Sequence, residues 1–332
     1  MKKLFSPKIL IILVLLLMLL LGAFINGQGA SKLPTLSEQE HVARYESEDN
    51  GYLLFMEAYD LLTSTATSLE DELSKLYEED EVSDALRSAL DSNIPALDKV
   101  REGLAKPYSI APYINVQSQA TKMNTLSYTR ELGRQLAYRA AVDRLDGNPE
   151  AALKGYLDIV RLGERSGQGG VLILGLVSVA IQDLATREAL EELLPDLSVE
   201  QLNHLIGILE AEEKKLISFE QILANERSAM VVGFSGKIQY LMAKKVLEPA
   251  FDRANESFKL RDAEIRRVLL KARVERYTRE HGEAPVTLED VMDGAPVPID
   301  PYTGAVFEFI DGQPYSADLE DVINKRKKSR NN

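Results

Sequence analysis

Carboxylate side chains near the C-terminus lie in two turn sequences. Asp300 precedes Pro301 and is followed by Gly304, and Asp311 directly precedes Gly312. An Asp at the start of a turn accepts hydrogen bonds from backbone N–H groups ahead of it, and carboxylates also coordinate hard cations such as Ca²⁺. The spacing of an EF-hand loop is absent. We therefore predict that these five residues shape turns and form neither a catalytic nor a metal site.

The residues between and after the two turns predict a β-hairpin. Residues 305–310 alternate between apolar and other side chains, as a strand does. The Asp-Gly pair that follows favours a two-residue turn of the primed type, and Pro314 in the returning strand is confined to a sheet edge. A lone hairpin is marginally stable in water. We expect three aromatic side chains to pack on the preceding helix: Phe307, Phe309 and Tyr315.

No other group of residues has the spacing of a known catalytic or metal motif. The chain has no Cys and three widely separated His residues, His41, His204 and His281, so a zinc site is not expected. Gly-Phe-Ser-Gly-Lys at 233–237 matches neither a nucleophile elbow nor a phosphate loop. Gly-Gln-Gly-Gly at 167–170 follows no predicted strand. We predict that the protein is not an enzyme and binds no cofactor.

One remote enzymatic alternative concerns a glutamate in the long charged helix. Asn-Glu-Ser-Phe at 255–258 resembles the helical Glu-Ser pair of lytic transglycosylases, which cleave peptidoglycan. The resemblance implies that Glu256 would protonate the glycosidic oxygen. The Gly-Leu-Met-Gln segment of that family is absent, and Lys259 and Arg261 are close in sequence. A solvated helix residue is the favoured interpretation of Glu256.

The negative charge is concentrated in one part of the chain. The net charge is −13, and residues 38–102 alone hold 18 acidic and 5 basic side chains. Phosphate backbones need a basic face, so we expect no nucleic-acid partner. The basic residues at 325–330 form a short tail that either is solvated or makes a weak contact with anionic lipid or polymer.

The N-terminus predicts a membrane anchor. Lys2, Lys3 and Lys8 precede an apolar run at residues 9–25, in which 14 of 17 residues are Leu, Ile, Val or Phe. Insertion of these side chains favours the bilayer by about 4–8 kcal/mol. Because lysines stay in the cytoplasm, the bulk of the protein is expected outside it. The alternative is a cleaved signal peptide and a secreted protein. Both interpretations place residues 31–332 across the membrane.

The rest of the sequence predicts a mainly α fold: a multi-helix bundle with a small C-terminal β-hairpin packed on a long helix. The helices are expected at residues 52–62, 82–104, 126–145, 149–162, 171–194, 199–223, 224–248 and 253–280. Pro95 should kink its helix or start a new one, and residues 163–170 are expected to be a glycine-rich break. Ser198 and Gln201 form a capping-box sequence.

We divide the chain into five segments on this basis. They are a basic start and transmembrane anchor (1–30), a linker (31–50), a helical domain (51–250), a long helix with the β-hairpin (251–323) and a basic tail (324–332).

Two helices of the middle region resemble one hairpin of a tetratricopeptide repeat. Gly147, Ala152 and Tyr156 have the spacing of that repeat, and Ala140 stands at the small position of its first helix. No second copy is found. Since a solenoid needs several units to bury a continuous core, we predict a single helical hairpin within a bundle.

The C-terminal region resembles that of type II secretion major pseudopilins. It contains a Gly-x-x-Pro-x-x-Leu step at Gly282, Pro285 and Leu288, and then Asp-Pro-Tyr-Thr-Gly at 300–304. The head of the apolar run lacks the Gly and Glu of a prepilin cleavage site. The resemblance implies a calcium site in the C-terminal loop. This is the alternative to the turn role favoured above for Asp300 and Asp311. The oxygen donors for such a site are Asp300, Glu308, Asp311 and Asp318.

A broader resemblance is to uncharacterised, membrane-anchored helical proteins of bacterial envelopes. It rests on Asn-Ile-Pro-Ala-Leu at 93–97, Leu-Asp-Gly at 145–147 and Asn-Glu-Arg at 225–227. This resemblance implies no known function. The predicted function is a membrane-tethered extracytoplasmic scaffold that binds a protein partner in the envelope. The alternative is an accessory component of a secretion or pilus-like machine.

Overall fold

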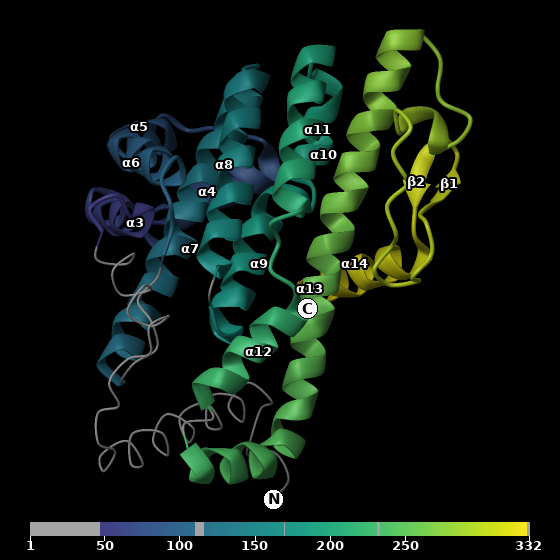
Figure 1. The fold of residues 1–332 in the computed structure, drawn as a ribbon. Coiled ribbons are helices and arrows are strands. Elements are labelled where there is room, and N and C mark those ends of the chain that lie inside the picture. The colour runs from purple at the N-terminus through teal and green to yellow at the C-terminus, as the bar shows by residue number, and fades with distance from the viewer. Residues whose placement is uncertain (1–46, 110–115, 169, 231–232, 331–332) are drawn as a thin grey trace, which may run out of the picture.

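The computed structural model describes residues 47–109, 116–168, 170–230 and 233–330 (Figure 1). This part of the chain is mainly helical and contains a small two-stranded antiparallel sheet, as predicted. No helix in it is both long enough and apolar enough to span a bilayer. The predicted anchor at residues 9–25 lies outside the described residues.

The described elements follow one another along the chain in this order. The first part contains α3 (Gly51–Asp60), η1 (Ala66–Leu69), α4 (Glu70–Glu79), α5 (Asp84–Ser92) and α6 (Ile94–Leu104). The middle contains α7 (Val116–Leu145), α8 (Pro149–Gly167), α9 (Leu172–Thr186), α10 (Ala189–Leu193), η2 (Leu194–Asp196), α11 (Val199–Glu213) and α12 (Phe219–Met230). The last part contains α13 (Gly233–His281), η3 (Glu289–Val291), β1 (Glu308–Ile310), β2 (Gln313–Tyr315) and α14 (Ala317–Arg330).

Capping residues set several of the helix ends. The Asn50 side chain accepts the Tyr52 N–H at the start of α3, and Ser198 and Gln201 form the predicted capping box of α11. Gly147, with φ of +72°, closes the turn between α7 and α8. These positions satisfy N–H groups that have no partner inside the helix or supply a backbone angle that favours glycine.

A buried asparagine separates α5 from α6. The predicted helix over 82–104 is divided there, and Pro95 lies in the first turn of α6, as one of our two expectations required. Asn93 is fully buried. Its Oδ1 accepts the Thr63 N–H at 2.9 Å, and its Nδ2 donates to the Ser64 carbonyl at 2.8 Å and to Gln135 Oε1 at 2.9 Å. Asn93 therefore connects the start of α6 both to the loop that follows α3 and to α7.

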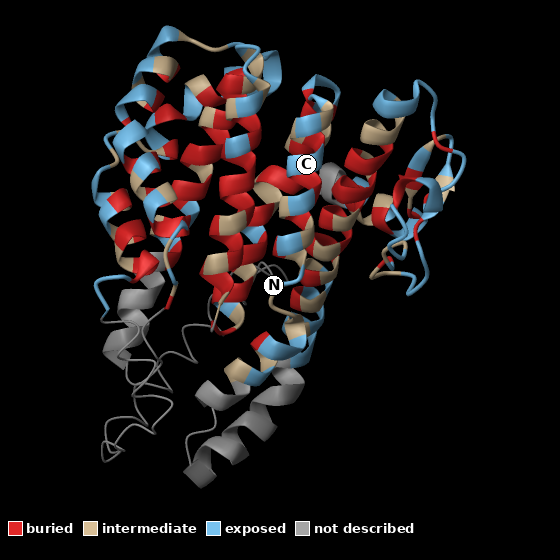
Figure 2. Cartoon of the chain, turned by 45° about the horizontal axis from the view of Figure 1, so that its top comes forward, coloured by how far each residue is buried: buried red, intermediate tan, exposed pale blue. Residues whose placement is uncertain are grey.

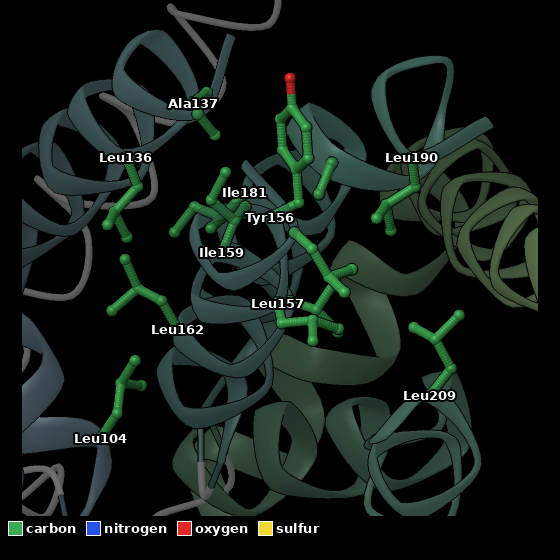
Figure 3. Packing of buried hydrophobic residues seen from close by; sticks show 14 of the residues in the cluster. Leu104, Leu136, Ala137, Tyr156, Leu157, Ile159, Leu162, Ile181, Leu190 and Leu209 are labelled. Atoms are coloured by element: carbon green, nitrogen blue, oxygen red, sulfur yellow. The ribbon is translucent and has the colours of Figure 1, made fainter. Parts of the chain in front are cut away.

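The main core is centred on α8 and α9. Its buried apolar side chains come from α3, α6, α7, α8, α9, α10, α11 and the middle of α13. Figure 3 shows Leu136 of α7, Ile159 and Leu162 of α8, and Ile181 of α9 in this core. Figure 2 shows the buried residues gathered on the helix faces that point toward one another. Burial of this apolar surface is the main force that holds the bundle together.

The α8–α9 contact is close enough to require glycine. Gly163 lies in α8, and a Cβ atom there would be 2.4 Å from Gln182 Cγ and 2.9 Å from the Ser178 carbonyl oxygen of α9. Ser178 Oγ donates to the Gly163 carbonyl at 2.6 Å. The glycine-rich break predicted at 163–170 is therefore wrong for residues 163–167, where α8 continues to Gly167. Glycine occurs at position 163 because the two helices pack closely there.

Further predictions are also wrong. The helix expected at 171–194 is divided into α9 and α10. The helices expected at 224–248 and 253–280 are not separate, because α13 is continuous from Gly233 to His281. Residues 199–223 are not one helix, since α11 ends at Glu213 and α12 begins at Phe219. A second capping pair precedes α12, in which Ser218 Oγ accepts the Gln221 N–H and Gln221 Oε1 accepts the Ser218 N–H. The C-terminal residues were expected as a tail, whereas α14 extends to Arg330 and has Ser316 at its start.

The hairpin packs on the face of α13 that points away from the bundle (Figure 1). Glu308 pairs with Tyr315, and Ile310 with Gln313. The turn residues have φ of +52° at Asp311 and +76° at Gly312, which is the predicted primed turn.

A second apolar cluster lies between the hairpin and α13. Phe307 is buried in it, and Phe309 is partly buried against it. These two aromatic side chains pack as expected. The expectation for Tyr315 is wrong, since it is only half-buried and does not belong to the cluster. Side chains alternate between the two faces of a sheet, and Tyr315 pairs with the exposed Glu308 on the outward face.

Two Gly→Ala substitutions should have opposite effects on stability. Gly163→Ala places a methyl group against α9 and should lower the free energy of unfolding by about 2 kcal/mol through overpacking. Gly207→Ala in α11 meets no atom within 4 Å and should raise that free energy by about 0.5–1 kcal/mol. Urea unfolding of both variants measures the difference. Equal effects at the two positions would contradict a tight α8–α9 contact.

Candidate functional site

The side chain of Asp300 is buried, and its hydrogen bonds are made within the same chain. Its exposed fraction is 1%. Oδ1 accepts the Tyr302 N–H at 2.9 Å, and Oδ2 accepts the hydroxyl groups of Ser316 at 2.7 Å and Thr303 at 3.2 Å. Gly304, with φ of +70°, returns its N–H to the Asp300 carbonyl at 2.9 Å. The predicted turn therefore forms around the carboxylate of Asp300.

Ser316 extends this turn to the last helix. Its Oγ donates to Asp300 and also accepts the Leu319 N–H at 3.2 Å, which caps the first turn of α14. One buried carboxylate thus holds the Asp-Pro turn and the start of α14 in a fixed relation. The carboxylate of Asp300 accepts three hydrogen bonds from this chain, which explains an acidic residue at this position without a bound ligand.

The other oxygen donors named by the pseudopilin resemblance are dispersed. Glu308, Asp311 and Asp318 are all exposed, whereas Asp300 is buried. Among the residues that the structure describes, no group of three or more His, Asp or Glu side chains is placed to hold a metal ion. The geometry therefore favours the turn role of Asp300 and Asp311.

The residues considered for catalysis lie apart from one another on the surface. Glu256 is on α13 with 52% of its side chain exposed, and its carboxylate is 3.5 Å from Lys259 Nζ. His204 is exposed on α11. His281 stacks on Tyr277 with ring centroids 4.0 Å apart at the end of α13. These are the environments of solvated helix residues.

A row of arginines along α13 donates to main-chain carbonyl groups of distant segments. Arg267 reaches the Arg187 carbonyl at 3.3 Å, Arg273 reaches Val291 at 3.0 Å, and Arg266 reaches Ile299 at 2.6 Å. The same side chains pair with carboxylates, among them Glu213 with Arg266 at 2.7 Å. Arginine suits such contacts because its planar group has five N–H donors. The sequence showed only a charged helix, and these partners were not predicted.

The start of α9 is capped from a distant helix. Val171 precedes α9 and offers no side-chain acceptor. Glu226 of α12 accepts the Leu172 N–H at 2.9 Å, and Asn225 Nδ2 donates to the Gly170 carbonyl at 2.9 Å. Burial raises the pKa of Glu226 above its ordinary value, and the hydrogen bond from Leu172 opposes that shift. The Asn-Glu pair noted in the sequence thus has a structural role.

A group of charged side chains, some of them buried, lies between α9, α10 and α13. Glu264 of α13 has an exposed fraction of 1% and faces Asp183 of α9. Arg187, just after α9, hydrogen-bonds to Asp183, and its Nε is 3.8 Å from Glu264 Oε1. Burial, followed by the charge of Asp183, raises the pKa of Glu264 to about 8. Two carboxyl groups in one buried site can share a proton.

Comparison with known proteins finds no match to this chain among family models, curated proteins or solved structures.

Substitution of Asp300 should destabilise the C-terminal region, whereas the same change at the second turn should not. Asp300→Asn replaces an acceptor oxygen with an amide donor opposite the Ser316 and Thr303 hydroxyl groups, at a cost of about 2 kcal/mol. Asp311→Asn keeps a side chain that tolerates positive φ and should change stability by less than about 0.5 kcal/mol. Denaturant unfolding with and without added CaCl₂ tests both roles. A calcium-dependent rise in midpoint that Asp300→Asn abolishes would contradict the structural role.

Proposed function

We propose that this protein is a membrane-tethered, extracytoplasmic helical scaffold that binds a protein partner in the cell envelope. The observation that carries the proposal is the run of apolar residues at 9–25 behind Lys2, Lys3 and Lys8. A run of this length and composition is typical of a spanning helix whose basic end stays in the cytoplasm.

The described body supports the scaffold part of the proposal. Its deeply buried polar side chains join elements to one another, as Asn93 joins α6 to α7 and Asp300 joins the turn to α14. The arginines of α13 connect α9 and α11 to the hairpin. Such cross-connections suit a rigid support, because each hydrogen bond between distant segments fixes the position of one element relative to another.

Single cysteines provide a direct test of topology, since the chain has no Cys of its own. Val286 is 85% exposed. Val286→Cys should react with a membrane-impermeant maleimide in intact spheroplasts. Lys3→Cys is the matched control and should react only after the membrane is permeabilised. Reaction of the Val286→Cys variant only after permeabilisation would disprove the orientation. Recovery of a soluble product that begins near residue 30 would support the secreted alternative.

The second candidate function is an accessory component of a secretion or pilus-like machine. The observation that favours it is the hairpin, which begins with Asp-Pro-Tyr-Thr-Gly and packs on a long helix. Its outward side chains Ile299, Val306 and Ile310 are exposed, and Ile299 and Val306 face each other across a β-bridge.

A photocrosslinking residue at Val306 tests the second candidate. Val306 is 53% exposed on the hairpin, and Tyr77 on α4 is a comparably exposed control. If the second candidate is correct, p-benzoylphenylalanine at 306 should capture pseudopilins or assembly-platform proteins from membranes, and the same residue at 77 should not. Recovery of the protein alone from both positions would remove the support for this function.

A further inference from the structure

The carboxyl groups of Asp183 and Glu264 meet across the contact between α9 and α13. They are 81 residues apart in the sequence, and Arg187 lies beside both, because it hydrogen-bonds to Asp183 and its Nε is 3.8 Å from Glu264 Oε1. Glu264 Oε1 is buried and has no hydrogen-bond partner. A buried carboxylate oxygen without a donor is costly when it is charged, so the arrangement favours a protonated carboxyl group at this position.

Arg187 and Arg267 lie near Glu264, and Arg267 connects it to further charged groups of α10, α13 and α14. Asp183 belongs to α9 and Arg187 follows it, Glu191 belongs to α10, and Arg267 and Lys271 belong to α13. Glu191 is 2.7 Å from both Arg267 and Lys271, and Arg267 also reaches Glu320 of α14 at 3.1 Å.

Loss of the proton from Glu264 places a second negative charge beside Asp183, where the burial of Glu264 weakens screening by water.

We propose that the Asp183–Glu264 pair is a proton-operated latch that holds α13 against α9 and loosens this contact in mildly alkaline surroundings. The second apolar cluster and the hairpin pack on α13, so the latch acts on the helix that connects them to the main core.

The direction of the pH effect follows from the raised pKa of Glu264. In the unfolded chain this carboxyl group titrates near its ordinary pKa of about 4.3, whereas in the folded protein its pKa is about 8. The stabilisation is therefore fully present below the ordinary pKa and is lost as pH rises through about 8. Arg187 and Arg267 oppose this shift, and burial and Asp183 outweigh them.

Glu264→Gln tests the latch, because the amide can still donate to Asp183 but cannot ionise. Thermal unfolding is followed from pH 5 to pH 9. At each pH the Tm of the unsubstituted protein is subtracted from the Tm of Glu264→Gln. This difference should increase by at least about 5 °C from pH 5 to pH 9. Glu256→Gln, an exposed glutamate of the same helix, should retain the pH dependence of the unsubstituted protein. Parallel profiles for the unsubstituted protein and Glu264→Gln would overturn the proposal.

Hydrogen exchange of the unsubstituted protein provides a test that needs no variant. After correction for intrinsic exchange rates, amides of α13 between residues 260 and 272 should open about tenfold more often at pH 9 than at pH 6.5. Amides of α6, which are distant from the pair in sequence and belong to another part of the core, should not change. Equal protection of α13 at both pH values would contradict a latch even if Glu264→Gln failed to fold.

Discussion

The structure depends on a helix that is buried on two sides. The middle of α13 contributes Val268, Leu269 and Ala272 to the main core. Its other side contributes Leu260, Leu270 and Val274 to the second apolar cluster. A helix in this position has little surface left for water, and its charged side chains must find partners inside the protein. The arginine-to-carbonyl contacts and the buried ion pairs of α13 follow from that constraint.

Much of the fold could be predicted from local signals. Alternation of apolar residues, the capping box at Ser198 and the Asp-Gly pair at 311–312 each predicted an element that the structure contains. The errors have physical causes. Ser218 starts a helix where periodicity suggested continuation. The helix α13 continues through Pro249, although a proline inside a helix removes one backbone donor and crowds the preceding turn. Gly163 was interpreted as a break because the sequence alone does not distinguish a glycine that close helix packing requires from a glycine that a turn requires.

The site residues were predictable only where their partners are close in sequence. Asp300 bonds to residues two, three and sixteen positions away, so turn chemistry was sufficient to assign its role. Asp183 and Glu264 are ordinary acidic residues in two separate helices, and nothing local shows that they meet. The only sequence signal was the number of arginines among the apolar positions of 261–279, which is unusual for a helix face that is expected to be solvated.

The capping of α9 by α12 affects the order in which the chain can fold during synthesis. The first turn of α9 receives its acceptor from Glu226, which leaves the ribosome 54 residues after Leu172. At roughly 5–20 residues per second this interval is on the order of 3–10 s. During this interval the first turn of α9 lacks its acceptor, and the apolar side chains of α9 that later pack against Ile222 and Phe258 remain uncovered.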